Sequence, residues 1–173
     1  MGPDVTIRPA TAADEAAITD LHARCIGDAF AGRYAPPAEE RAERQSGWAG
    51  AIGSPHPRHA LLVAEHAGRV VGFVAVGPAR DPDRDSATSA ELRVILVDAR
   101  ERGLGVGSAL IAAAERAMRQ SGFADATLWV LPENSQAVRC YERCGWRADG
   151  AERITDFGGS EIRSVRYERP LAS

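Results

Sequence analysis

A β-rich run that passes through three closely spaced glycines into a helix dominates the middle of the chain. The run is predicted over 91–97, the glycines are Gly103, Gly105 and Gly107, and the helix follows over 108–120. Glycine accepts a positive φ and lets another group approach the backbone closely. Free N–H groups at the start of a helix, together with the helix dipole, favour an anion. The stretch therefore predicts a strand–turn–helix unit whose turn can hold a diphosphate.

Three kinds of cofactor-binding turn have to be distinguished. A dinucleotide-binding G-x-G-x-x-G fails in both registers, because Ser108 or Leu110 stands at its last position. A P-loop needs a lysine, and all 21 basic residues of the chain are arginines. The pattern R/Q-x-x-G-x-G/A fits 102–107, and Arg102 adds a positive charge at the rim. A glycine-rich turn without a ligand is the other interpretation that the hexapeptide allows.

A second motif, N-S-Q-A-V-R-C-Y-E-R-C-G-W, occupies 134–146 and follows a predicted strand at 126–131. In order and spacing, the two motifs resemble the GNAT superfamily of acetyl-CoA-dependent N-acyltransferases. The opening I-R-P-A-T-A-A-D resembles the usual start of that family, and the tail over 145–170 resembles the closing strands of its bacterial members. The resemblance covers nearly the whole chain and is specific for the cofactor, but it says little about the acceptor.

The patterning of the remaining apolar residues predicts one α+β domain over 1–173, with an ordered core over about 5–170. Strands are predicted at 5–8, 61–65, 70–76, 91–97, 126–131, 151–156 and 162–169. Helices are predicted after the capping residue Thr11 and at 38–52, 108–120 and 134–143. This order indicates a mixed, mostly antiparallel sheet. The resemblance implies the GNAT-type acyl-CoA N-acyltransferase fold, a twisted sheet flanked by helices with splayed strands at the cofactor site.

Composition argues against several classes of partner. The net charge of −3 provides no basic excess for nucleic acid. No apolar run approaches the roughly 18 residues of a membrane helix, and the first residues have neither the basic nor the apolar region of a secretory signal. Three cysteines, an odd number, favour a reducing compartment. We therefore expect a cytoplasmic protein without a nucleic-acid or membrane partner, and the resemblance to bacterial members of the family implies a bacterial protein; a homodimer is compatible with the sequence.

The resemblance implies acetyl-CoA as cosubstrate and assigns its contacts residue by residue. In the family, the pantetheine arm lies between two diverging parallel strands and pairs with backbone groups, while the diphosphate lies on the glycine-rich turn. The asparagine of the second motif contacts the arm, and a small residue one helical turn later leaves room for it. The implied cofactor-binding set is Ile95, Leu96, Val97, Arg102, Gly103, Leu104, Gly105, Val106, Gly107, Ser108, Asn134, Ala137 and Tyr141.

The chemistry of acetyl transfer to an amine needs few groups. A neutral amine attacks the thioester, and a base or a water chain removes its proton. A backbone N–H near Val97 can stabilise the oxygen that gains charge. Tyr141 holds the place of the tyrosine that protonates the leaving thiolate in the family; alternatively, it is a helical aromatic packed on the sheet. Neither a metal nor a covalent enzyme intermediate is expected.

Glu91 is the candidate base. It stands eleven residues before Arg102, where several family members carry a catalytic glutamate. Strand alternation places it on the face shared with Arg93, Ile95 and Val97. Two alternatives stay open: a carboxylate at the strand edge paired with an arginine, and ordered water as the base.

Other reactive side chains fit structural roles better. Cys140 and Cys144 lie four residues apart on one predicted helix, but no second ligand pair accompanies them, which favours small buried residues over a metal site. The four histidines are scattered, and we assign them surface or structural positions: His22, His56, His59 and His66.

The acceptor amine, on a small molecule or a peptide, is not identified by the sequence. Candidate acceptor segments are 30–34, 80–89 and 156–160, and acidic residues such as Asp28 and Asp156 could attract a cationic amine. Polyamine, aminoglycoside, amino acid and peptide all stay open. The second functional hypothesis is a catalytically inactive acyl-CoA-binding sensor or regulatory module. The presence of both Tyr141 and Glu91 favours the enzyme.

Overall fold

The computed structural model describes residues 5–29, 47–53, 56–157 and 160–171. The strands are β1 (Val5–Pro9), β2 (Ala60–His66), β3 (Arg69–Pro78), β4 (Ser89–Val97), β5 (Asp125–Val130), β6 (Arg147–Phe157) and β7 (Ser160–Pro170). The helices are α1 (Glu15–Ala29), α3 (Val106–Gln120) and α4 (Ser135–Arg143), with short 3₁₀ turns η1 (Ala12–Asp14) and η2 (Ala99–Glu101). Residues 47–53 are also helical. The predicted acceptor segment 30–34, and the first part of the helix predicted over 38–52, lie outside the described residues.

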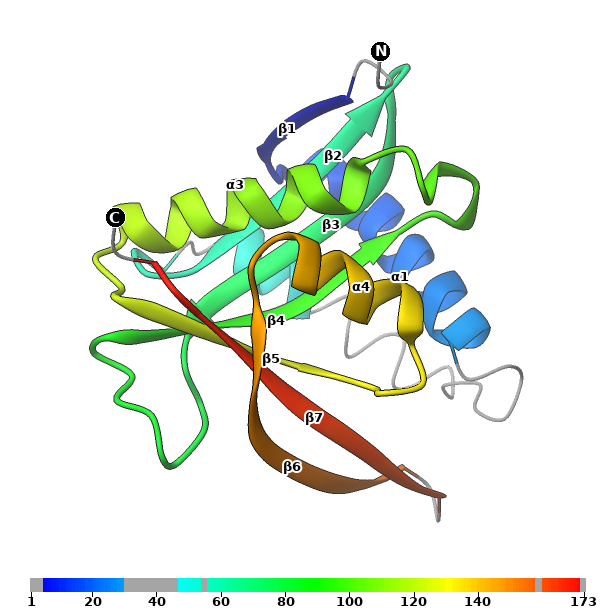
Figure 1. Ribbon diagram of the computed structural model, residues 1–173. Coiled ribbons are helices and arrows are strands. Elements are labelled where there is room, and N and C mark those ends of the chain that lie inside the picture. Colours follow the sequence, from blue (N-terminus) through cyan, green and yellow to red (C-terminus); the bar gives the residue numbers. More distant parts are fainter. Residues whose placement is uncertain (1–4, 30–46, 54–55, 158–159, 172–173) are drawn as a thin grey trace.

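The seven strands form one sheet in the order β1-β2-β3-β4-β5-β7-β6. The β4–β5 pair is parallel and the other neighbours are antiparallel, which confirms the predicted mixed, mostly antiparallel α+β fold. Figure 1 shows α3 and α4 in front of the sheet and α1 behind it. The β6–β7 hairpin extends beyond the rest of the sheet.

Each face of the sheet has its own apolar core. On the α3 side, one face of the helix predicted at 108–120 is buried against the strands: Leu110, Ile111, Ala114 and Met118. Removing such a side chain from water contributes roughly 1.5–3 kcal/mol. On the α1 side, a second cluster forms where the helix packs on Val63 and Phe73: its helical members are Ile18, Leu21 and Cys25. The sheet is therefore held between two helical layers.

The start of the α1 region follows the predicted capping pattern. The Thr11 N–H donates to the Asp14 carboxylate over 2.7 Å, and the Asp14 N–H donates to the Thr11 carbonyl over 2.9 Å. Arg8 also donates to both Asp14 oxygens, over 2.8 and 2.9 Å. These bonds join β1 to the helical layer behind the sheet.

A β-bulge in β4 reverses the side-chain alternation that the sequence predicts. Leu92 is opposite Val76 and Val94 is opposite Ala75, so Arg93 is an extra residue without a partner in β3. An inserted residue shifts every later side chain to the other face.

The predicted face shared by Glu91, Ile95 and Val97 is therefore wrong. Ile95 and Val97 pack in the core under α3 and α4. Glu91 lies on the opposite face, with Val94 and Leu96 of the α1-side core.

The parallel strands β4 and β5 pair over only four residues each. The pairing runs from Ser89–Asp125 to Leu92–Leu128, just before the bulge. Beyond it, β4 stays with β3 while β5 stays with β7. The two strands diverge there, as predicted for the site between them.

Candidate active site

The glycine-rich turn follows the free end of β4. Gly103 and Gly105 have φ values of +80° and +88°, which L-residues adopt only with strain. Gly105 is the N-cap of α3, and the Ala109 N–H makes a 3.0 Å bond to the Gly105 carbonyl. The preceding N–H groups at the start of α3 have no partner inside the helix. A helix end of this kind, here next to the end of β4, can bind an anion.

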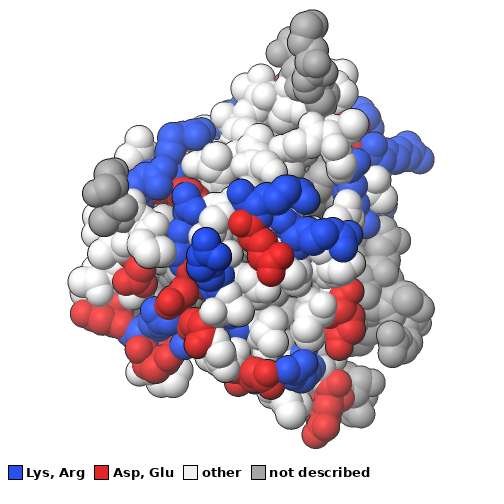
Figure 2. Space-filling view, viewed as in Figure 1, with Lys and Arg blue, Asp and Glu red and all other residues white. Residues whose placement is uncertain are grey.

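Helix α4 packs near this turn. The Cys140 Sγ lies 3.7 Å from the Ser108 Oγ, and a Cβ built on Gly107 would stand 3.7 Å from the same sulfur. Asn134 caps α4, because its side-chain oxygen accepts the Ala137 N–H over 3.2 Å. The structure thus brings the second sequence motif beside the first. On the face that carries α3 and α4, arginine and acidic side chains are interspersed (Figure 2).

Tyr141 is buried in the core between α4 and the sheet, with 6% of its surface exposed. Its ring lies 6.3 Å from that of Trp146. Burial raises the pKa of the Tyr141 phenol well above its usual range. At neutral pH the residue is a protonated phenol that packs on the sheet and can donate a proton.

Glu91 lies on the other face of the sheet, near the end of the β4–β5 pairing, where it is opposite Thr127. It is buried, and both of its oxygens accept hydrogen bonds from Arg80, over 2.7 and 2.9 Å. The hydrogen bond to Glu91 raises the pKa of Arg80. The pairing with an arginine that the sequence left open is therefore present. Each carboxylate oxygen still has a lone pair for a water or an amine.

An ion-pair network holds the β3–β4 loop over the same face. Arg166, buried on β7, donates to Asp81, Asp83 and Asp149. The Trp129 Nε1 donates to Asp81 over 3.0 Å. The candidate acceptor segment at 80–89 is thus tied to the distant strands β5, β6 and β7. Sequence reasoning missed these partners; the alternating charges of R-D-P-D-R-D at 80–85 were the available signal.

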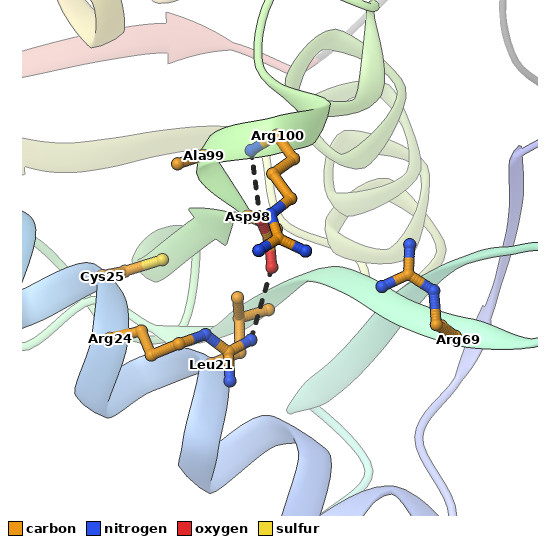
Figure 3. Close-up of a pocket in the computed structure, with 7 residues that line it drawn as sticks. All are labelled: Leu21, Arg24, Cys25, Arg69, Asp98, Ala99 and Arg100. Atoms are coloured by element: carbon orange, nitrogen blue, oxygen red, sulfur yellow. Dashed lines mark hydrogen bonds and ion pairs between the residues drawn. The ribbon is translucent and has the colours of Figure 1, made fainter.

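A separate cavity of about 550 Å³ lies where α1 meets the end of β4. Its lining residues are Leu21, Arg24, Cys25, Arg69, Asp98, Ala99 and Arg100 (Figure 3). The Asp98 carboxylate accepts hydrogen bonds from the Arg100 N–H over 3.0 Å and from Arg24 over 3.3 Å. The Arg100 N–H and the Arg24 charge lower the pKa of Asp98. The Arg24–Asp98 ion pair joins α1 to the residues that precede the glycine-rich turn.

Two kinds of site find no support in the described part of the chain. No group of three His, Cys, Asp or Glu residues there is placed to hold a metal ion. No helix within these residues is long and apolar enough to cross a membrane. Of the acidic acceptor candidates, Asp156 is exposed, and the side chain of Asp28 lies outside the described atoms.

The diverging parallel strands, with a glycine-rich turn and a second helix at their open end, define an acyltransferase domain. The model of the Acetyltransferase (GNAT) family matches residues 18–146, so the chain belongs to this family of N-acetyltransferases. A phosphinothricin N-acetyltransferase from Streptomyces viridochromogenes is 29% identical over 153 residues, which are 88% of this chain and 80% of that protein.

Other relatives match over less of their length or in fold alone. A mycothiol acetyltransferase from Thermobispora bispora is 35% identical over 92 residues, 51% of this chain and 31% of that protein. The chain thus spans about a third of that relative. A GNAT superfamily phosphinothricin acetyltransferase from Sinorhizobium meliloti, solved in complex with acetyl-CoA, superposes with a TM-score of 0.71 at 22% identity, covering 96% of this chain and 88% of that one.

Proposed function

We propose that this chain moves an acetyl group from acetyl-CoA to a primary amine by direct attack. The observation that carries the proposal is the row of free helix N–H groups, placed where β4 leaves its parallel neighbour. The diphosphate of the cosubstrate can then bind at the glycine-rich turn, and its thioester arm can lie next to it in the gap between β4 and β5. Acetyl-CoA supplies the activated acetyl group.

The residues of the turn and the gap fit this cosubstrate. The turn at 102–107, exposed at 102–105, holds the diphosphate together with Ser108, and the backbone of Ile95, Leu96 and Val97 holds the pantetheine arm. The Val97 carbonyl already accepts from the Arg102 Nε over 3.2 Å, so other backbone groups of the strand bind the arm. Asn134 and Ala137 border the arm from α4.

Tyr141 is the proton donor for the leaving thiolate. Its burial favours the neutral phenol, so the proton is still on Tyr141 when the C–S bond of the thioester breaks. The thiolate that leaves into the gap takes this proton, and the phenolate is then reprotonated from solvent. The backbone N–H near Val97 stabilises the oxygen of the attacked carbonyl.

Glu91 accepts the amine proton from the opposite face, directly or through a water. Arg80 holds the carboxylate in one orientation and leaves lone pairs for this purpose. The acceptor therefore enters from the α1 side of the sheet, while acetyl-CoA lies on the α4 side. The divergence of β4 and β5 is where the two meet.

The direct test measures acetyl-CoA binding and thiol release over a panel of amines. Binding together with release on an amine supports the enzyme. Binding without release on any amine supports the alternative, an acyl-CoA-binding sensor. A folded protein that does not bind acetyl-CoA overturns both.

A further inference from the structure

Two arginines beside Glu91 have no carboxylate partner within the described residues. Arg93 is half-buried, and its only hydrogen bond to a described residue goes from Nη2 to the Pro78 carbonyl, over 3.0 Å. Its Nε is buried and has no acceptor in the described part of the chain. Arg153, on β6, lies with its guanidinium carbon 4.3 Å from the centre of the Trp129 ring. Both guanidinium groups are within electrostatic range of Arg80 and Glu91.

The position of Arg93 is set by the surrounding backbone. It is the bulged residue of β4, and its guanidinium lies against Gly77 of β3. A Cβ at Gly77 would stand 2.9 Å from the Arg93 Cζ and 2.6 Å from the His59 Cδ2. Only glycine leaves room for the cation there, and the Pro78 carbonyl fixes its orientation. The side chain is held on the face of Glu91 and not free in solvent.

Within the described residues, neither Arg93 nor Arg153 has a carboxylate at hydrogen-bonding distance, although Glu91 lies within electrostatic range of both and Asp81 within range of Arg153. Arg80 is paired with Glu91, and Arg166 is paired with three aspartates. Arginine cannot lose its charge in a protein, so Arg93 stays cationic although burial lowers its pKa. A half-buried guanidinium whose Nε has no hydrogen-bond acceptor among the described residues is unfavourable unless a ligand or a water supplies one.

We propose that Arg93, assisted by Arg153, binds an oxyanion of the acceptor, so that the acceptor is an amine that also carries a carboxylate or a related acidic group. Glu91 attracts the amine of this zwitterion, and Arg93, two residues along the same face, attracts its anion. The planar guanidinium can hold two oxygens at once. Amino acids and acidic amino-acid analogues match this pattern, whereas polyamines and aminoglycosides present only positive charge. The inference rests on the proposed function and narrows its substrate class.

The test compares matched acceptors in the thiol-release assay with acetyl-CoA. Each pair consists of an amino acid and its carboxamide, and a diamine is added as a purely cationic acceptor. We expect kcat/KM for the free acid to exceed that for the amide by about tenfold to a hundredfold, as for a lost hydrogen bond to a charged group. Arg93→Met should bring the acid-to-amide ratio close to one. Arg116→Met, at an exposed position on α3, removes the same charge outside the site and should leave the ratio as in wild type.

A second variant tests whether the acid-to-amide ratio depends on where the Arg93 guanidinium lies and not only on its charge. Gly77→Ala keeps Arg93 but displaces its guanidinium, so the acid-to-amide ratio should also fall. Melting temperature and acetyl-CoA affinity, measured on each variant, show that the fold and the cofactor site are intact. A ratio that falls with Arg93→Met and with Gly77→Ala supports the inference.

The contrary outcomes distinguish the two proposals. Amide or diamine used by wild type as well as the free acid overturns the anionic acceptor and leaves the acetyltransferase standing. The same holds if Arg93→Met lowers kcat/KM equally for acid and amide. Acetyl-CoA binding without thiol release on any amine overturns the proposed function. The acid and amide are then compared by their shift of the melting temperature of the acetyl-CoA complex: equal shifts overturn the anion site as well, and a larger shift with the acid that Arg93→Met abolishes supports it.

Discussion

Arg80 donates from Nε and Nη2 to the two carboxylate oxygens of Glu91, over 2.7 and 2.9 Å. Only 5% of the Glu91 side chain is exposed, against 61% for Arg80. A residue of a surface loop thus supplies the countercharge for a carboxylate inside the sheet. The orientation of the Glu91 carboxylate depends on this loop, which Arg166 holds in place through Asp81 and Asp83.

Glu91→Gln keeps the shape of the side chain and removes its basic group. If Glu91 accepts the amine proton, kcat/KM should fall by about a hundredfold near neutral pH, the lower range for a general base. The rate should recover at high pH, because the free amine then loses its proton to solvent. The pH–rate profile and the melting temperature are measured on one preparation.

Arg80→Gln is the matched control for Glu91→Gln. It leaves a buried carboxylate without its cation, so it should lower the melting temperature more than Glu91→Gln does. An intact Glu91→Gln protein with a wild-type profile over the whole pH range would contradict the catalytic role. Ordered water would then be the base.

Tyr141→Phe keeps the buried ring and removes the proton that the leaving thiolate needs. We expect turnover to fall by about 100- to 10,000-fold where chemistry limits the rate. Acetyl-CoA affinity and the melting temperature should change little, because the ring contacts with Trp146 persist. An unchanged turnover number under these conditions would leave Tyr141 with a packing role alone.

Substitutions in the glycine-rich turn should separate strain from cofactor contact. Gly105→Ala places a side chain at a φ of +88° and should lower the free energy of unfolding by about 1–3 kcal/mol. Gly122→Ala, at a φ of +84° beyond the other end of α3, should cost as much but leave acetyl-CoA affinity unchanged. At Gly107 a Cβ meets only ordinary van der Waals contacts, so the Gly107→Glu protein should fold. It should lose acetyl-CoA binding, because the added carboxylate occupies the place of the diphosphate and repels it. A folded Gly107→Glu protein that binds coenzyme A as tightly as wild type would disprove the site. Calorimetry measures the affinities.

Acid should destabilise the protein through the carboxylates of its ion pairs. The hydrogen bond from Arg166 lowers the pKa of Asp83 from 3.8 to about 2, and Arg8 lowers that of Asp14 further. A carboxyl group whose pKa is lower in the folded state than in the unfolded state stabilises the fold at pH values above its unfolded-state pKa. This stabilisation is lost as the pH falls through the folded-state pKa. Stability should therefore decrease between about pH 4 and pH 2. In Arg166→Met this decrease should be shallower, since Asp83 then titrates near its ordinary value; denaturant midpoints across this range test it, and an unchanged slope would count against the network.

The sequence by itself predicted the elements whose signals are local. The stripe of Leu110, Ile111 and Met118 follows the period of a helix, and the positive φ of Gly103 and Gly105 needs only the residue itself. The turn, the strands around it and the order of helices and strands along the chain were therefore predictable, because each element depends on a few neighbouring residues.

Only the tertiary structure decided on which face Glu91 lies and which side chains meet it. The bulge at Arg93 has no local signature, since the packing of β4 against β3 determines the register. Arg166 reaches Asp81 and Asp83 across more than 80 residues of chain, and periodicity says nothing about such distances. Charged side chains form ion pairs with groups that are close in the folded protein. Whether a cation such as Arg93 has a carboxylate partner is therefore decided by the fold and not by its neighbours in the sequence.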